Sequence, residues 1–338
     1  MDAVNTLRAG VIGLGVGEQH VAGYRSVPGV EVAAICDTDP KRLAEVVRRN
    51  DIPLQTADYR KITEHPDIDV VSVCSYDMAH AEQVLSALRH GKHVMVEKPV
   101  VLFRPELEQV VRAQQESGRL LTSNLILRES PRFKALKRMI AAGEFGEIYA
   151  IEGDYIHEIL RKITEGWRGK QPFYSVTYGG GIHLIDLMRW LVDDEVTEVA
   201  GMAAKILTRG SATYPYPDTI TNLLRFSRGA TGKTMTSFGP PRPHFHALSV
   251  FGTKKAFVND LPDAKLFDGT DEKQNVHAFT EPYPAYEKGN LLPNFIAAIR
   301  DGREPNVTAR DVFRVMDICF ACWEAADKGR HVQVSYTV

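Results

Sequence analysis

The sequence predicts an α/β protein of two domains, in which a doubly wound parallel sheet is followed by an α+β domain with a largely antiparallel sheet. Up to about residue 124, short apolar runs alternate with helix-period segments, which is typical of parallel strands with helices on both faces. Beyond that point apolar strands follow one another without helices between them, which favours antiparallel pairing. The length of 338 residues also exceeds what one hydrophobic core usually serves. We therefore expect two domains, at residues 1–124 and 125–338.

The elements of the first domain follow from its apolar runs. Gly91 lies just beyond one predicted helix, where a left-handed cap is expected. The predicted strands end at Leu14, Cys36, Val73 and Val96, with a last strand at Leu120–Asn124; the predicted helices are Lys41–Arg49, Ala79–Arg89 and Pro105–Gln115.

The second domain is predicted to begin with a helix, to continue with strands and to end with helices. The final helix, at about residues 306–330, is expected to pack back on the first domain. The predicted strands are Ile148–Ile156, Val196–Leu207, Thr219–Phe226, Thr231–Phe238 and Leu248–Phe251; the predicted helices are Pro131–Ala142, Leu291–Arg300 and Ala309–Lys328.

Composition excludes several functions. A formal net charge of -2 argues against a broad nucleic-acid-binding surface. No apolar run approaches the roughly 20 residues that span a bilayer, and no secretory signal is visible, so we expect a cytoplasmic protein without a membrane partner. Cys319 and Cys322 lie inside a predicted helix, which favours core packing over redox chemistry. His244 and His246 have no matching ligands nearby, so no metal site is predicted.

A glycine-rich loop closes the first strand and opens a helix. It contains Gly13, Gly15, Val16 and Gly17, whereas the third position of a G-x-G-x-x-G pattern is Glu18. Glycine lets the backbone turn sharply and approach a pyrophosphate, and the helix N-terminus attracts that anion. Gly17 can take the third role through a contraction of one residue. The alternative is a simple turn.

An acidic residue supports dinucleotide binding. Asp37 ends the next strand, at the distance where an acid that binds the adenosine ribose is expected. A carboxylate there repels a 2′-phosphate, so the sequence favours NAD over NADP. Lys41 and Arg42 lie close by, and we interpret them as solvated residues of the following helix.

Two segments carry candidate acid–base groups. Glu97-Lys98-Pro99 follows the strand that ends at Val96, at the edge where doubly wound sheets bind ligands. Lys98 can donate to a substrate oxygen, or it is a surface lysine; Pro99 is a candidate cis proline. His183 follows three glycines and suits proton exchange near neutral pH, or it is a buried histidine at a helix start.

Together these segments resemble the family named for glucose–fructose oxidoreductase, inositol dehydrogenase and a rhizopine-catabolism protein (Gfo/Idh/MocA). The resemblance covers nearly the whole chain. It rests on the glycine loop followed by His20, Asp37, the Glu97-Lys98-Pro99 triplet, the H-x-x-D segment at His183 and Asp186, the Phe251-Gly252-Thr253-Lys254-Lys255 segment and the stretch from Asn294 to Gly302.

The resemblance implies a Rossmann domain followed by a domain with an open-faced sheet. It implies Lys98 and His183 as the catalytic pair, and assembly into a homodimer or homotetramer through the second-domain sheet. The family often has an aspartate four residues before the catalytic histidine, where this chain has Gly179. Tyr178 is adjacent and is a candidate replacement, although packing is its other interpretation. Asp186 either orients His183 or anchors the helix start.

Candidate substrate contacts come from three places. Trp167 and Arg168 lie in a basic and aromatic loop that suits a sugar nucleotide or a sugar acid, unless the loop is solvated and its tryptophan is an anchor. Tyr155 and His157 share one face of a strand and either line the site or pack. Arg128 is a candidate by rough alignment with a basic position of the family.

The sequence thus predicts an NAD-dependent oxidoreductase that moves hydride between a nicotinamide and a hydroxyl or keto carbon of a sugar, polyol, sugar acid or nucleotide sugar. Two alternatives remain at this point: a ligand-sensing protein of the same fold without turnover, and an NAD-assisted, redox-neutral glycosidase. The cofactor contacts are expected from Gly13, Gly15, Val16, Gly17, Asp37, Glu97 and Lys98; the substrate contacts are expected from Arg128, Tyr155, Trp167, Arg168, Tyr178 and Asp186.

Overall fold

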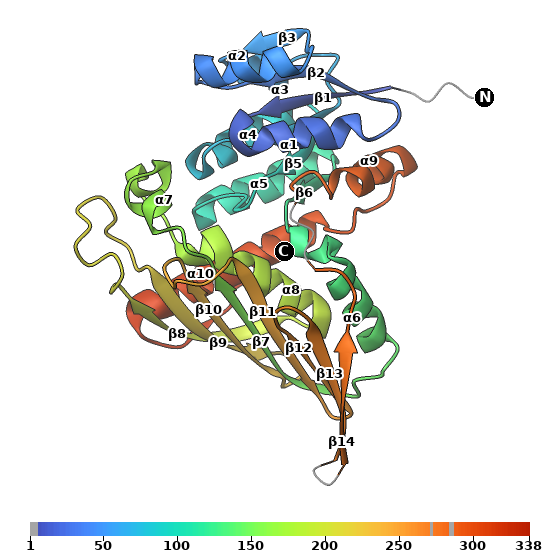
Figure 1. Ribbon diagram of the computed structural model, residues 1–338. Helices are drawn as coiled ribbons and strands as arrows, with labels where there is room; N and C mark the ends of the chain where they lie inside the picture. The colour runs from blue at the N-terminus through green and yellow to red at the C-terminus, as the bar shows by residue number, and fades with distance from the viewer. Residues whose placement is uncertain (1–5, 271–272, 284–286) are drawn as a thin grey trace. The chain divides into compact units, whose positions relative to one another are not determined.

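The computed structural model describes residues 6–270, 273–283 and 287–338 (Figure 1). The chain forms two compact units. The first contains the described residues up to Ile126, those from 287 to Arg314 and the last two residues; the second contains the described residues from Leu127 to 283 and from Val315 to Tyr336. Each unit has its own sheet and its own buried core.

The first unit is built on a six-stranded parallel sheet with the strand order β3-β2-β1-β4-β5-β6. This is the order of a doubly wound dinucleotide-binding fold, in which the order reverses between β1 and β4. The central strands are almost entirely buried, as apolar strands covered on both faces should be. The strands are β1 (Leu7–Ile12), β2 (Val30–Cys36), β3 (Leu54–Thr56), β4 (Val70–Val73), β5 (His93–Val96) and β6 (Leu121–Ser123).

Helices connect these strands, and local signals set their ends. Asp39 caps one helix with its carboxylate, which accepts from the backbone N–H groups of Lys41 and Arg42, and proline occupies the first turn. Gly91 has a φ of 73° after another helix, which confirms the predicted left-handed cap. The helices are α1 (Leu14–Arg25), α2 (Pro40–Arg49), α3 (Arg60–Thr63), α4 (His80–Arg89), α5 (Arg104–Ser117) and α9 (Leu292–Asp301).

The second unit is built on a nine-stranded sheet with the order β14-β13-β12-β11-β7-β10-β9-β8-β15. Only β7 and β10 pair in parallel; the other neighbouring strands are antiparallel. The strands are β7 (Ile148–Ile156), β8 (Val196–Ala204), β9 (Thr219–Phe226), β10 (Thr231–Ser237), β11 (Phe245–Gly252), β12 (Lys255–Asn259), β13 (Ala264–Thr270), β14 (Lys273–Phe279) and β15 (Val332–Gln333).

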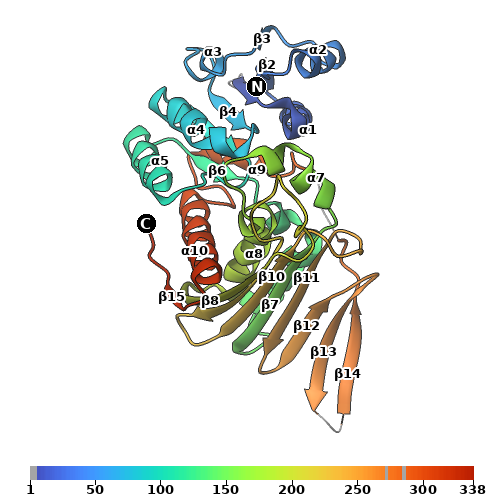
Figure 2. The ribbon, with the colours of Figure 1, turned by 90° about the vertical axis from the view of Figure 1, so that its left-hand side faces the viewer.

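Helices cover one face of this second sheet (Figure 2). The unit contains α6 (Pro131–Ala141), α7 (Leu160–Thr164), α8 (Ile182–Val192) and the part of α10 (Ala309–Lys328) that follows Arg314. A side chain at Gly153 of β7 would meet Leu184 and Met188 of α8 at 3.1 Å, which shows how closely α8 packs on the strand. Asn222 of β9 donates to the backbone oxygen of Cys322 in α10 at 3.1 Å.

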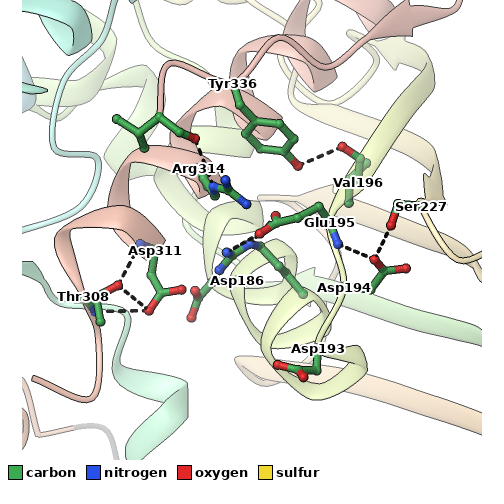
Figure 3. A network of polar contacts seen from close by, with 12 residues as sticks. Asp186, Asp193, Asp194, Glu195, Val196, Ser227, Thr308, Asp311, Arg314 and Tyr336 are labelled. Atoms are coloured by element: carbon green, nitrogen blue, oxygen red, sulfur yellow. Dashed lines mark hydrogen bonds and ion pairs between the residues drawn. The ribbon is translucent and has the colours of Figure 1, made fainter. Parts of the chain in front are cut away.

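A polar network anchors the end of α8 to the sheet (Figure 3). Arg189 forms a bidentate pair with Glu195, both contacts being 2.7 Å long. Asp194 accepts a hydrogen bond from the hydroxyl of Ser227, which lies just after β9. Tyr336 donates to the backbone oxygen of Val196 at 2.8 Å. The first two contacts hold the C-terminal end of α8 and the residues after it against β8 and β9, and the third holds Tyr336 against β8.

The structure confirms the predicted fold class and corrects several boundaries. The first strand ends at Ile12 rather than Leu14, because Leu14 already begins α1 and its N–H is bonded to Asp37. The strand predicted to reach Leu207 stops at Ala204, where the chain turns toward β9. Strands β12 to β14 were not predicted, because charged and polar residues interrupt their apolar positions. Among the described residues, no helix is long and apolar enough to span a membrane.

Candidate functional site

The glycine loop lies at the carboxyl end of β1, beside the turn that follows β4. Gly13 has a φ of 83°, and a Cβ at this position would lie 2.6 Å from the backbone of Cys74. A Cβ at Gly15 would meet nothing within 4 Å, so this side of the loop is open. A Cβ at Gly17 would lie 2.9 Å from Val11, so Gly17 permits the close packing of helix on strand that the third glycine of the pattern provides.

Two charged residues, Asp37 and Arg42, form hydrogen bonds with the backbone of the glycine loop. The Asp37 carboxylate accepts from the N–H of Leu14 at 2.7 Å and from the N–H of Asp39 at 2.8 Å. Arg42 donates to the backbone oxygen of Leu14 at 3.0 Å and pairs with Glu18 at 3.3 Å. The interpretation of Arg42 as a solvated residue was therefore wrong, because its guanidinium is held between the loop and Glu18.

Glu97, the first residue after β5, is buried in a polar network. Its carboxylate accepts from the side-chain amide of Asn124 at 2.7 Å, and His20 Nε2 lies 3.5 Å from it. On its other side, His20 Nδ1 contacts the hydroxyl of Ser72 at 3.0 Å. Asn124 also donates to the backbone oxygen of Lys288 at 3.1 Å. The glycine-loop helix, β4, β5 and β6 are thus joined by one polar network around this carboxylate.

The charge of Glu97 is stabilised by its surroundings. Burial acts to raise the pKa of this carboxyl group, but Lys288, His20 and Lys98 lower it, and the net effect is a pKa well below the usual range. Glu97 is therefore a buried anion next to Lys98. Cys74, which is also buried in this region, has its pKa raised by burial and by the charge of Glu97.

Lys98 is partly exposed, and the peptide bond to Pro99 is cis, as the sequence suggested. The turn that contains them is fixed by His80, a buried residue at the start of α4. Its Nδ1 lies 2.7 Å from the backbone oxygen of Pro99, and its Nε2 lies 3.1 Å from the backbone oxygen of Ser75. His80 therefore joins the turns that follow β4 and β5.

In the second unit, three glycines bring His183 against the sheet. Residues Thr177–Gly181 form a π-helical turn that continues into α8, whose first turn contains His183. A Cβ at Gly179 would lie 2.0 Å from the hydroxyl oxygen of Tyr174; at Gly180 it would lie 2.5 Å from the ring of Tyr155; at Gly181 it would lie 2.3 Å from the hydroxyl of Thr236. No side chain fits at these positions, so the backbone comes to the sheet directly.

Tyr155 of β7 lies at the centre of a group of imidazoles. The ring of His183 stacks with it at a centroid distance of 6.1 Å and an angle of 21°. His157, His244 and His246 lie 5.1 to 6.1 Å from the same ring. His157 was noted in the sequence for sharing a face with Tyr155. His244 and His246 were considered only as metal ligands, because strand pairing alone brings them to β7.

Arg128 and Asp186 form a buried ion pair with each other. Arg128 Nη2 lies 2.6 Å from Asp186 Oδ1, and its Nε lies 2.9 Å from Oδ2. Their side chains are 3% and 1% exposed, so both charges are removed from water. The pair joins the segment before α6 to α8, three residues from His183.

The other predicted substrate contacts are dispersed. Trp167 and Arg168 are partly exposed, and the guanidinium lies 4.5 Å from the centre of the indole ring. Tyr178 is buried, with its ring against Phe173 and Phe320 at 5.7 and 5.8 Å, which supports its interpretation as a packing residue.

Cys319 and Cys322 are both buried in α10, which confirms that they are core residues. Within the described parts of the chain, no group of three or more His, Cys, Asp or Glu side chains is arranged to hold a metal ion.

The loop region of the first unit fits a dinucleotide. The strand order places the loop at the point where the order reverses, which is where ligands of such sheets bind. The open side of Gly15 and the start of α1 suit the pyrophosphate, and Asp37 is in place after β2 for a ribose. Gly13, Gly15, Val16, Gly17 and Asp37 are the residues that would hold the group.

Comparison with known proteins agrees with this geometry. Residues 7–125 match the model of the oxidoreductase family with an NAD-binding Rossmann fold, and residues 133–258 match the model of the GFO/IDH/MocA C-terminal domain. An oxidoreductase of Bacillus subtilis, YrbE, is 29% identical over 97% of this chain and 96% of its own length. Myo-inositol 2-dehydrogenase of Thermotoga maritima is 25% identical over 98% of this chain and its full length.

Solved structures show the same fold. A levoglucosan dehydrogenase in complex with NADH and L-sorbose superposes with a TM-score of 0.89, at 22% identity over 98% of this chain and 100% of that one. Fold, glycine loop and acidic residue thus define an NAD-dependent oxidoreductase. The chain belongs to the Gfo/Idh/MocA family.

Proposed function

We propose that this enzyme oxidises a hydroxyl group of a sugar-like substrate, or reduces the corresponding ketone, with Lys98 and His183 as the catalytic pair. The observation that carries the proposal is the position of Lys98. It follows β5 directly, next to the buried anion Glu97, in a turn that His80 joins to the turn after β4. Sheets of this order bind ligands at this edge.

The substrate class is supported by the relatives. They include proteins named myo-inositol 2-dehydrogenase, 1,5-anhydro-D-fructose reductase and levoglucosan dehydrogenase. Each name denotes a polyhydroxylated ring or its ketone. A sugar, polyol, sugar acid or nucleotide sugar is therefore the substrate that we propose for this chain.

The proposed chemistry divides the work between two side chains. When bound, NAD⁺ supplies the hydride acceptor. Lys98, as an ammonium, donates a hydrogen bond to the substrate oxygen and favours its loss of a proton. His183 takes that proton during oxidation and returns it during reduction. Glu97 keeps a negative charge beside Lys98, which favours the charged form of the lysine.

We assign the two parts of the chain corresponding roles. Residues 1–124 bind NAD through Gly13, Gly15, Val16, Gly17 and Asp37, with Glu97 and Lys98 toward the nicotinamide end. Residues 125–338 bind the substrate and carry the oligomer interface. In this proposal Tyr155, Trp167 and Arg168 contact the substrate, whereas the buried Arg128–Asp186 pair and Tyr178 support the residues around His183.

The test is NADH formation by the purified protein with NAD⁺ and a panel of polyols, sugars, sugar acids and nucleotide sugars. Lys98→Ala and His183→Ala should each lower kcat/KM by roughly 10²- to 10⁴-fold, the range for loss of an acid–base group. NADH binding, followed by fluorescence, should persist in both variants. Lys41→Ala and His277→Ala, which change exposed residues, are the matched controls.

Three results would contradict the proposal. Normal turnover by the Lys98→Ala, His183→Ala double variant excludes the catalytic pair. Tight NADH binding without turnover of any substrate supports a ligand sensor. Release of a sugar from a glycoside without net NADH formation supports a redox-neutral glycosidase.

A further inference from the structure

Four imidazoles of the second unit lie against one tyrosine ring. We call His157, His183, His244 and His246 the imidazole cluster. His157 and His244 stack with their centroids 4.0 Å apart and their planes at 12°. His244 lies 4.7 Å from His246, which lies 6.2 Å from His183. Tyr155 contacts all four rings.

The sheet builds this cluster. Tyr155 near the end of β7 is the cross-strand partner of His246 at the start of β11. His157 follows the end of β7 and His244 precedes β11, so both lie at the same end of this strand pair. The ring of Tyr155 packs on Gly180, which brings the first turn of α8 and His183 to this place.

The protonation of neighbouring imidazoles is coupled to the binding of a charged ligand. An imidazole has an unperturbed pKa of about 6.5, so it changes its charge near neutral pH. When several lie within 4 to 6 Å, a proton on one opposes a proton on the next, and they titrate together. An anion bound at the cluster offsets this repulsion. Binding of an anion is therefore coupled to proton uptake.

The segments that carry His157 and His244 are basic. Residues 157–170 and 239–246 together contain five lysine or arginine residues and two glutamates, a formal charge of +3 in a chain whose net charge is -2. One of these glutamates, Glu165, is paired with Arg161 at 3.2 Å. Arg242 lies over the ring of Phe245, the residue between His244 and His246.

Carboxylates also lie on and beside these elements. Glu158, which follows His157, accepts from the backbone N–H of Leu160 at 3.4 Å. Asp154 of β7 pairs with Lys233 at 2.7 Å, and Asp186 of α8 pairs with Arg128. Tyr155 and Tyr283 also contact the cluster, and the hydroxyl oxygen of Tyr283 lies 2.7 Å from His246 Nδ1. The excess of basic residues in the two segments thus favours a negative ligand.

We propose that the imidazole cluster, through His157 and His244, binds the carboxylate of a sugar acid. This inference rests on the proposed function for the substrate's sugar-like character and narrows its class. His157 and His244 are partly exposed, whereas His183 and His246 are buried, so the outer pair contacts the carboxylate. His183 remains the group that exchanges the proton with the reacting hydroxyl.

The experiment compares ligands in which a carboxylate replaces a hydroxymethyl group. Titration calorimetry on the full-length protein with NADH bound uses D-galacturonate against D-galactose and D-gluconate against D-glucitol. Buffers of different ionisation enthalpy report proton uptake. We expect at least one acid to bind about tenfold or more tighter than its neutral partner, with net proton uptake and with an affinity that falls as the pH rises from 6 to 8.

Variants of the cluster test whether His157 and His244 cause the preference for the acid. His157→Gln and His244→Gln should reduce the preference for the acid to threefold or less and should remove the proton uptake. His277→Gln on β14, which removes an exposed imidazole, should leave both unchanged. Equal binding of every acid and its neutral partner, or an intact preference in the two variants, would overturn the proposal. Tighter binding of D-galactose 6-phosphate than of D-galacturonate would overturn the choice of a carboxylate.

The two proposals fail in different ways. If Lys98→Ala abolishes NADH formation but no acid is preferred, the proposed function stands and this inference is wrong. If an acid is preferred with proton uptake but Lys98→Ala turns over normally, the carboxylate site stands and the catalytic assignment is wrong.

Discussion

At the scale of single residues, the glycines before His183 have an identifiable steric role. Three successive residues face Tyr174, Tyr155 and Thr236 at distances that leave no room for a Cβ atom. The hydroxyl of Tyr174 occupies the space in which a side chain at position 179 would begin. This explains why an aspartate does not fit at Gly179 in this chain, and it makes Tyr174, rather than Tyr178, the side chain beside that position.

We expect Gly179→Ala to lower the free energy of unfolding by about 1–3 kcal/mol, the usual effect of forcing extra volume into a packed region. Urea unfolding of the variant and the wild-type protein measures the difference. Gly210→Ala is the matched control, because a Cβ there would meet nothing within 4 Å. Adding Tyr174→Phe should recover part of the loss, since the atom at 2.0 Å is the tyrosine hydroxyl. An unchanged stability of Gly179→Ala would show that the turn adjusts freely.

The candidate site was only partly predictable at this scale. Lys98 and His183 were predicted from the sequence because each follows a recognisable pattern: a lysine after a strand and a histidine after a glycine run. Their supporting residues were missed. His80 bonds the backbone of Ser75 and Pro99, and Asn124 bonds Glu97 across 27 positions of sequence, so no local spacing indicates either contact.

At the scale of elements, polar contacts determine how strands are joined to their neighbours. His93 begins β5, and its Nδ1 accepts from the N–H of Leu120 at 3.1 Å, just before β6. Burial lowers the pKa of His93 to about 4, and the nearby charge of Arg119 adds to this effect. At pH values between about 4 and 6.5 the imidazole is therefore neutral in the folded protein but charged in the unfolded chain.

The sign of the pH dependence follows. Between pH 6.5 and about 4 the unfolded chain binds a proton at His93 that the folded protein does not, so stability falls as the pH falls. The substitution His93→Asn keeps an acceptor for the N–H of Leu120. Between pH 7 and pH 5, we expect the free energy of unfolding of this variant to fall by about 1 kcal/mol less than that of the wild-type protein, after allowing for partial exposure. Urea unfolding at both pH values measures this, with His90→Asn as the control. Equal losses in wild type and His93→Asn would contradict the assignment.

At the scale of the whole molecule, the outer face of the nine-stranded sheet stands out. Met202 and Leu223 are 80% and 60% exposed on neighbouring strands, and Val276 on β14 is 57% exposed. The register places these residues on the face opposite to α8 and α10, because Gly201 and Asn222 between them face α10. Exposed apolar surface of this kind is typical of a protein–protein interface.

We predict that this face forms the interface of a homodimer or homotetramer. Light scattering coupled to gel filtration should give an oligomer for the wild-type protein and a smaller species for Met202→Glu combined with Leu223→Glu. The change in mass arises because four buried carboxylates in a symmetric dimer would have no partners. Ile206→Glu, at a residue 66% exposed between β8 and β9, is the control. A monomeric wild-type protein would exclude the interface.

The sequence by itself determined the alternation of strands and helices, the glycine loop with Asp37, and the order of Lys98 and His183 along the chain. These features depend on residue type and on short-range periodicity, which indicate helices and strands directly. The parallel pairing of β7 with β10, the buried Arg128–Asp186 pair and the imidazole cluster around Tyr155 were decided only by the tertiary structure. Each joins residues from distant segments, and such contacts depend on strand order and on how closely helices approach a sheet.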